Sequence, residues 1–147
     1  QKNFGALIVL LRDTGLRSIV ETGLPIRAQV SKALLMSLFN PRSPLHDGAV
    51  VIQGDVVLAA KCQLPLTQNP KVDPSLGMRH RAAIGLSEQT DAIVLVVSEE
   101  TGMISLAENG VLTRGLTEET LQKRLQEAFS PKVRKRRTFA DFLGWGD

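Results

Sequence analysis

The sequence predicts an α/β fold in which a mixed, mostly buried β-sheet is flanked by helices. Four short apolar runs are continuous rather than alternating, which is typical of strands covered on both faces. Three segments combine helical spacing of apolar residues with capping signals. Helices interspersed with buried strands and hairpins pack as layers around one sheet, and this combination indicates the fold class.

The four apolar runs are expected to form the centre of the sheet. They are residues 5–11 (GALIVLL), 49–52 (AVVI), 56–60 (VVLAA) and 92–97 (AIVLVV). The sequence QGD at 53–55 predicts a hairpin between the second and third runs. A further hairpin is expected within 101–112, turning at Asn109-Gly110, because this dipeptide favours two-residue turns.

Three helices are expected beside these strands. The first begins after the capping residue Ser31 and ends before Asn40-Pro41. The second runs from about 79 to 89, and the third begins after Thr117, where two glutamates suit a helix N-terminus. Their inward faces are predicted to carry Leu34, Leu35, Leu38 and Phe39, then Ala82, Ala83 and Leu86, then Leu121, Leu125 and Phe129.

The composition indicates one globular domain followed by a basic tail. The chain has 147 residues, of which 43% are hydrophobic and 22% charged, enough for a single domain with a buried core. The net charge of +3 arises from KVRKRR at 132–137, without which 13 basic residues face 15 acidic ones. We therefore expect a domain at 1–130, a basic tail at 131–147 and no nucleic-acid binding by the domain.

Several kinds of site are excluded by the sequence. It lacks the glycine patterns of phosphate loops, dinucleotide-binding turns and nucleophile elbows. One cysteine and two histidines are too few for a structural zinc site. No apolar run is long enough to cross a bilayer, so a soluble fragment is expected. Only four residues precede the first strand, which suggests that an upstream part of a longer protein is missing.

Two segments place charged side chains at the start of an expected element. In SPLHDGAVVI (43–52), the carboxylate of Asp47 stands on a glycine turn before a strand, although Asp-Gly is also an ordinary turn dipeptide. In GMRHRAA (77–83), Arg79, His80 and Arg81 lie at a helix start, where free N–H groups and the helix dipole favour an anion. Guanidinium groups bind phosphate oxygens in a bidentate manner, but a solvated basic turn is the alternative.

A third segment, VSEETG (97–102), follows the most apolar strand. Ser98 offers a hydroxyl to a phosphate, and Glu99 or Glu100 offers a carboxylate to a hard cation such as Mg²⁺. A solvated loop is the alternative for this segment taken alone. The three segments together favour a site for a metal and a nucleotide phosphate.

The tripeptides Asp47-Gly48-Ala49 and Arg79-His80-Arg81, in this order, resemble the two defining motifs of the diadenylate cyclase domain. The resemblance extends from about residue 5 to 129 and is greatest to the membrane-anchored bacterial type. It implies condensation of two ATP molecules into cyclic di-AMP, with release of two pyrophosphates and with Mg²⁺ or Mn²⁺ as cofactor. The sequence departs from the family pattern at Met78, where threonine is usual, and at Gln63, where an aromatic residue is frequent.

The same resemblance implies a role for each candidate residue. Asp47 stands beside the ribose 3′-OH as base or metal ligand, and Gly48 and Ala49 keep the backbone small there. The phosphate chain is bound by Arg79, His80, Arg81 and Ser98. His46 and Glu100 are expected to contact metal or phosphate, and the backbone of Leu64 to read the adenine edge.

Because one domain binds one ATP, the resemblance implies a homodimer whose two sites face each other. Regulatory proteins that cover this face are possible partners, and the parent protein is expected on the cytoplasmic face of a bacterial plasma membrane. Two alternatives remain open at this point. One is a catalytically silent ATP-binding domain, and the other is a nucleic-acid module that depends on the basic tail.

Overall fold

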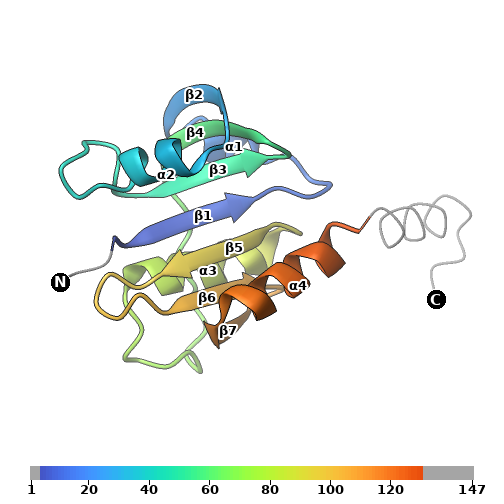
Figure 1. Cartoon of the computed structure of the whole chain (residues 1–147). Coiled ribbons are helices and arrows are strands. Elements are labelled where there is room, and N and C mark those ends of the chain that lie inside the picture. The colour runs from blue at the N-terminus through green and yellow to red at the C-terminus, as the bar shows by residue number, and fades with distance from the viewer. Residues whose placement is uncertain (1–3, 131–147) are drawn as a thin grey trace, which may run out of the picture. The chain divides into compact units, whose positions relative to one another are not determined.

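A seven-stranded mixed sheet forms the centre of the structure, a computed structural model that describes residues 4–130 (Figure 1). The strands are β1 (Ala6–Leu10), β2 (Leu24–Gln29), β3 (Ala49–Gln53), β4 (Val56–Cys62), β5 (Ile93–Val97), β6 (Ile104–Glu108) and β7 (Val111–Leu116). Their order across the sheet is β2-β4-β3-β1-β5-β6-β7. Strand β1 is parallel to β3 and antiparallel to β5, which makes the sheet mixed, as the sequence predicts.

Four helices accompany the strands in the described residues: α1 (Arg17–Val20), α2 (Lys32–Leu38), α3 (Met78–Gln89) and α4 (Glu118–Ala128). The chain divides into two compact units, 1–115 and 116–147. The first unit contains α1, α2 and α3, and Figure 1 shows α2 and α3 on opposite faces of the sheet. Within residues 4–130, no helix combines the length and the hydropathy needed to cross a membrane.

The core occupies both faces of the sheet. Val9 on β1 pairs with Val51 on β3 and with Val94 on β5, and all three side chains are completely buried. One face packs against the buried Leu86 of α3 and the other against Leu38 of α2. The prediction that helices cover a buried sheet on two sides is therefore confirmed.

The helix starts agree closely with the sequence. The hydroxyl of Ser31 accepts a hydrogen bond from the N–H of Leu34 at 3.0 Å, which caps α2. Helix α3 begins at Met78, one residue before the expected start. Helix α4, in the second unit, is capped by Thr117, whose hydroxyl accepts from the N–H of Thr120. The physical signals that predicted these helices are thus present as hydrogen bonds.

Both predicted hairpins are present. Strands β3 and β4 pair across Gly54-Asp55, with Gln53 opposite Val56. Strands β6 and β7 are neighbours joined by Asn109-Gly110, whose φ angles are 53° and 80°. Two positive φ angles are what a tight hairpin turn requires, and asparagine and glycine adopt them at low cost.

Helix α1 and strand β2 were not expected from the sequence. Strand β2 lies at the edge of the sheet, and its pairing with β4 is irregular between Pro25 and Ala28. Arg27, inside this irregular stretch, has a positive φ of 53°. A strand with proline, a charged residue and a register shift carries no apolar run, so the sequence pattern could not reveal it.

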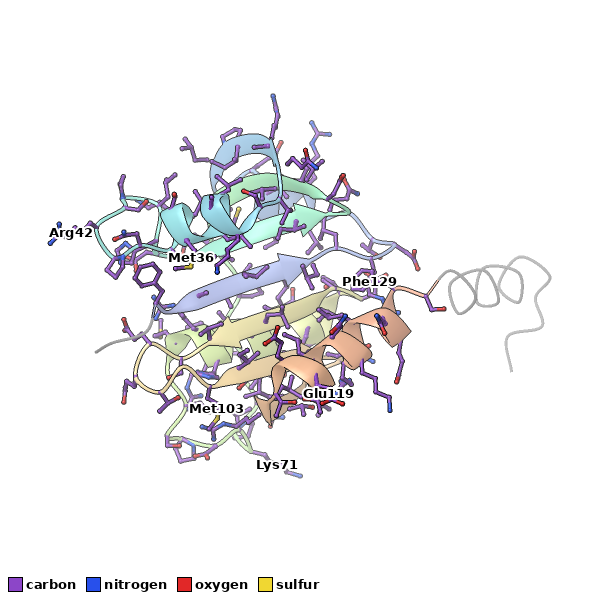
Figure 2. All side chains as sticks on the ribbon, viewed as in Figure 1. Met36, Arg42, Lys71, Met103, Glu119 and Phe129 are labelled. Atoms are coloured by element: carbon purple, nitrogen blue, oxygen red, sulfur yellow. The ribbon has the colours of Figure 1, made fainter. Side chains whose placement is uncertain are left out.

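Two long connections border the same end of the sheet. One joins α2 to β3 and contains Arg42, and the other joins β4 to α3 and contains Lys71; Figure 2 shows both side chains pointing outward.

The basic tail predicted at 131–147 lies outside the described residues, and the domain boundary at 130 stays a prediction.

Candidate nucleotide-binding site

The sheet topology collects the predicted site residues at one end of the sheet. Strands β1 and β3 are parallel and begin at this end, whereas β4 and β5 run in the opposite direction and finish there. Asp47 therefore precedes β3 at the same end at which Ser98 follows β5. The N-terminus of α3, with Arg79, lies beside them in one cavity.

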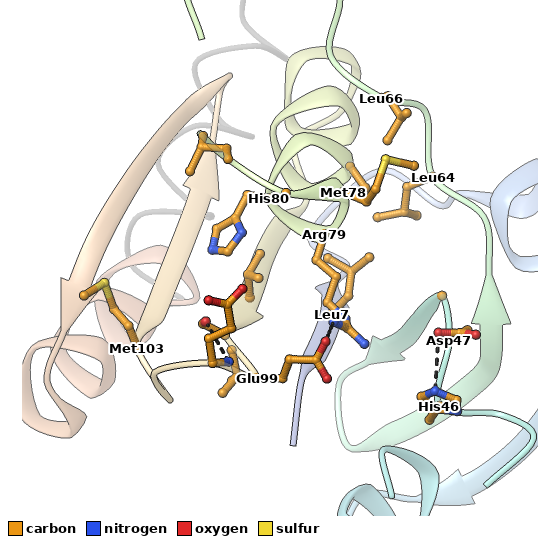
Figure 3. Close-up of a pocket in the computed structure, with 18 of the residues that line it drawn as sticks. Leu7, His46, Asp47, Leu64, Leu66, Met78, Arg79, His80, Glu99 and Met103 are labelled. Carbon is orange, nitrogen blue, oxygen red and sulfur yellow. Dashed lines mark hydrogen bonds and ion pairs between the residues drawn. The ribbon is translucent and has the colours of Figure 1, made fainter. Parts of the chain in front are cut away.

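The cavity has a volume of about 690 Å³ and is partly open to solvent, and Figure 3 shows side chains that line it. Its walls include most of the side chains that the sequence indicated. The predicted residues that line it are His46, Asp47, Gly48, Leu64, Arg79, His80, Ser98 and Glu100. Segments separated by more than fifty residues in the chain thus form one concave site, as binding of a nucleotide requires.

Asp47 is held at the mouth of β3 by the conformation of Gly48. Gly48 has φ +86°, and a Cβ at this position would lie 2.8 Å from the carbonyl oxygen of Cys62 on β4. Only glycine satisfies both constraints without strain. The side chain of Asp47 is 75% exposed, so its carboxylate faces the open cavity rather than the core.

His46 is oriented by the backbone beside Asp47. Its Nδ1 lies 2.8 Å from the carbonyl oxygen of Ser43, which only accepts, so Nδ1 carries the hydrogen. In the neutral ring, Nε2 then keeps its lone pair, and it lies 3.4 Å from Oδ1 of Asp47 (Figure 3). The two side chains therefore present a nitrogen and a carboxylate oxygen to the same place.

Arg79 lies at the centre of the cavity, between β1 and the loop after β5. Its guanidinium forms an ion pair with Glu99 at 3.7 Å, and both side chains point into the cavity (Figure 3). Helix α3 begins after Gly77, which supplies no side-chain cap. The uncapped N–H groups of the first turn and the Arg79 guanidinium together form an anion-binding surface.

Two residues of the predicted motifs do not line the cavity. Ala49 is completely buried beneath it. The Arg81 guanidinium donates hydrogen bonds to the carbonyl oxygens of Leu76, at 3.1 Å, and Asp73, at 3.2 Å. Arg81 therefore fastens the loop before α3, and this loop forms part of the cavity wall through Ser75 and Leu76.

His80 faces the cavity beside a residue that the sequence did not indicate, Arg114 on β7. Partial burial lowers the pKa of His80, and the positive charges of Arg114 and Arg79 lower it further. The imidazole of the ligand-free protein is therefore mainly neutral at pH 7. Arg114 escaped notice because only the order of the strands brings β7 to this cavity.

Ser98 organises the loop that carries the two glutamates. Its Oγ accepts hydrogen bonds from the N–H groups of Glu100 and Thr101, each at 3.3 Å. Its backbone closes the same turn, because the N–H of Gly102 donates to the Ser98 carbonyl. The hydroxyl hydrogen of Ser98 remains available to a ligand oxygen in the cavity.

The segment around Leu64 is packed tightly onto α3. A Cβ on Gly85 would overlap the carbonyl oxygen of Pro65, so the backbones touch at this point. The N–H of Thr67 donates to the carbonyl of Arg81, which fixes the segment further. Within residues 4–130, neither the backbone N–H nor the backbone C=O of Leu64 has a hydrogen-bond partner, and Leu64 lines the cavity.

The described residues of this cavity do not favour a cysteine nucleophile or a metal ion that is coordinated by protein groups alone. Cys62 lines it, but burial raises the pKa of its thiol to about 11, so the nucleophilic thiolate is scarce at neutral pH. The described residues contain no group of three or more His, Cys, Asp or Glu side chains arranged to hold a metal. Any cation here must take part of its coordination from a ligand.

An α/β domain with a carboxylate, an uncapped helix N-terminus and an arginine in one cavity has the groups that suit a nucleotide-binding protein. Comparison with known families agrees: the DAC family, described as DisA bacterial checkpoint controller nucleotide-binding, matches residues 1–112. The chain belongs to this family. The resemblance to diadenylate cyclase domains that the two motifs predicted is therefore confirmed.

Relatives of known function are similar over most of this chain. It is 48% identical to the cyclic di-AMP synthase CdaA of Bacillus subtilis over 134 residues, which are 91% of this chain and 49% of CdaA. It is 46% identical to the diadenylate cyclase of Listeria monocytogenes over 145 residues, which are 98% of this chain and 53% of that protein. The chain thus spans about half the length of these relatives.

Solved structures confirm the fold. A double mutant of DacA from Staphylococcus aureus superposes with a TM-score of 0.83 at 46% identity, covering 86% of this chain and 85% of the DacA chain. A protein from Bacillus cereus described as a hypothetical membrane spanning protein gives 0.75 at 50% identity, covering 78% of this chain and 56% of that one. The mixed sheet with flanking helices is the architecture of the DAC family.

Proposed function

We propose that this chain is the catalytic domain of a diadenylate cyclase, which joins two ATP molecules into cyclic di-AMP and releases two pyrophosphates. The 3′-oxygen of each ribose forms a bond to the α-phosphorus of the other nucleotide. The bond between that phosphorus and the oxygen leading to the β-phosphate breaks, and the 3′-OH proton is lost. The observation that carries the proposal is that Asp47 and Arg79 line one cavity with the uncapped N-terminus of α3.

The order of groups across the cavity supports this reaction. Unpaired backbone groups at Leu64, after β4, suit the hydrogen-bonding edge of adenine. Asp47, before β3, is the next group along the sheet, and we assign to it the acceptance of the ribose 3′-OH proton. Arg79 follows over β1, where it binds the phosphates, because such transfer depends mainly on positioning and charge neutralisation.

The remaining predicted residues support the phosphate chain. His80 and the hydroxyl of Ser98 face the cavity and act as phosphate contacts. Gly48 allows the turn that exposes Asp47, whereas Arg81 and the buried Ala49 act from behind the wall. Diadenylate cyclases of this family use ATP as substrate, and this set of donors suits a polyanion of that kind.

A divalent cation fits the same residues, and we assign Mg²⁺ or Mn²⁺ to this place. The Asp47 carboxylate and Nε2 of His46 are oriented side by side, and Glu100 lines the cavity opposite. Cations of this kind are held by one or two protein groups when substrate phosphates and water complete the shell. When bound, the cation would neutralise phosphate charge and favour loss of the 3′-OH proton.

Symmetry of the product implies a face-to-face homodimer, because a cavity that holds one ATP supplies only half of a two-nucleotide reaction. The open side of the cavity is the surface on which the second protomer sits. A regulatory protein that covers this surface would stop the reaction.

Membrane anchoring at the cytoplasmic face of a bacterial plasma membrane is part of the same proposal. It is supported by the relative from Bacillus cereus that is described as membrane spanning.

The test is incubation of the purified chain with ATP and Mg²⁺ or Mn²⁺, with cyclic di-AMP measured by chromatography. Asp47→Asn removes the proposed base, and Asp55→Asn, in the exposed β3–β4 turn, is the matched control. We expect product from the wild type and Asp55→Asn, and a loss of at least about a hundredfold in Asp47→Asn. ATP binding without product in any variant or metal would instead support a silent ATP-binding domain.

A further inference from the structure

Arg114 is the one positively charged side chain in the cavity that neither sequence motif contains. It lies on β7, lines the cavity and is exposed. Within residues 4–130, its guanidinium forms no hydrogen bond or ion pair with another side chain. Arg79, by contrast, is paired with Glu99. Among the described residues, no side chain therefore occupies the donors of the Arg114 guanidinium in the cavity.

The charge of Arg114 reaches the binding surface of α3. It lowers the pKa of His80, as does Arg79, and all three side chains line the cavity. The cavity thus contains three groups that can bind phosphate oxygens, Arg79, His80 and Arg114. A single phosphate occupies one or two of them, whereas a chain of phosphates extends along all three.

The strand order shows how the cavity residues are arranged across the sheet. Leu64 follows β4, Asp47 precedes β3, Arg79 lies over β1, and Arg114 is on β7, at the far edge of the sheet. From β3 to β7 there are four strand intervals, about 19 Å at the usual spacing of neighbouring strands. Arg114 therefore belongs to a strand that is farther from Asp47 across the sheet than β1, over which Arg79 lies.

From this order we infer that Arg114 binds the β- and γ-phosphates of ATP and holds the pyrophosphate as it leaves. The inference rests on the proposed function, because the adenine and ribose positions orient the nucleotide. Arg114 thereby makes the site selective for a triphosphate over a monophosphate. The reaction needs such selectivity, since only a nucleotide with a β-phosphate has a leaving group.

The test compares the binding of two ligands to three proteins by calorimetry. The ligands are α,β-methylene ATP, which the enzyme does not turn over, and AMP, which lacks the distal phosphates. The proteins are the wild type, Arg114→Met and Arg17→Met. Arg17 is an equally charged residue whose side chain is 91% exposed, outside the cavity. Thermal melting of each variant confirms that it is folded.

We expect Arg114→Met to weaken the binding of α,β-methylene ATP by roughly tenfold and the binding of AMP by less than about twofold. Arg17→Met should change neither value. Arg114→Lys, which keeps the charge but not the fork of donors, should recover part of the lost affinity. Inhibition by free pyrophosphate should weaken in parallel with the ATP analogue.

Equal weakening of both ligands, or no change in either, would overturn the inference. This result is distinguishable from failure of the proposed function. If the wild type makes cyclic di-AMP and Arg114→Met still binds both ligands normally, only the role of Arg114 is lost. If the wild type binds the ATP analogue but makes no product, the cyclase proposal fails while the two-ligand comparison still decides the role of Arg114.

Discussion

The guanidinium of Arg79 lies directly against Gly5, the residue before β1. A Cβ on Gly5 would stand 2.7 Å from both Cζ and Nη1 of Arg79. The absence of a side chain at Gly5 therefore gives the guanidinium its place in the cavity. Gly5 belongs to neither motif, yet it determines where the arginine of the second motif can lie.

Replacement of Gly5 by alanine should displace Arg79 and weaken ATP binding. Because the neighbour is the end of a flexible side chain, the guanidinium moves and the core is preserved. We expect KM for ATP to rise about three- to tenfold while Tm changes by less than about 2 °C. Steady-state kinetics and thermal melting measure the two effects.

Gly15→Ala is the matched control, because a Cβ there meets nothing within 4 Å. It should leave KM unchanged. An unchanged KM in Gly5→Ala would show that Arg79 binds ATP from another position.

Removing the charge of Glu99 and removing the charge of Glu100 should change the affinity for ATP in opposite directions. Glu99 pairs with Arg79 at 3.7 Å and so competes with the nucleotide for its guanidinium. An ion pair this exposed contributes little, so Glu99→Gln should tighten ATP binding by about two- to fivefold. Glu100→Gln should weaken binding in the presence of Mg²⁺. Titration calorimetry on both variants would refute this account if the two changed affinity in the same direction.

The lowered pKa of His80 should make part of the stability depend on pH. The His80 imidazole binds a proton more readily in the unfolded chain than in the folded protein. The stability that comes from this difference is therefore fully present above the pKa of the unfolded state, near 6.5. It is lost as the pH falls toward the folded value. We expect Tm to drop between pH 7.5 and pH 5, and to drop less in His80→Gln. Equal decreases in the two proteins would contradict a shift at His80.

Gly85, the one glycine of α3, should not tolerate a side chain. A Cβ there would overlap backbone atoms of Pro65 and Thr67, which cannot rotate away. Gly85→Ala should cost about 1–3 kcal/mol of unfolding free energy, or about 3–10 °C in Tm. It should also move the Leu64 segment and weaken adenine binding. A melting curve like that of Gly15→Ala would disprove this packing.

The sequence predicted the parts of the fold that local rules determine. The central strands are apolar on both faces, and the helices carry capping residues such as Ser31 and Thr117, so their positions could be read directly. Helix α1 has only four residues, and β2 contains Pro25 and a register shift. Such edge elements depend on the neighbours they pack against, which a single sequence does not reveal.

The site was predicted to the extent that its residues form compact motifs. Asp47 and Arg79 were found because each stands near the start of an element and within two residues of a glycine. Arg114 and Gly5 were missed because they reach the cavity through strand order and close packing. Arg81 was assigned to phosphate, but its hydrogen bonds to Leu76 and Asp73 depend on how the preceding loop folds back.

All of these groups lie at one end of the sheet, so the opposite end is remote from the nucleotide cavity. The turns at Gly54-Asp55 and Asn109-Gly110 lie at that opposite end, and both consist of exposed or partly exposed residues. Gly54-Asp55 joins two strands that are already paired, so extra chain added there loops out into solvent. A fluorescent or affinity peptide placed in this turn would label the protein while the nucleotide cavity and its open face stay intact.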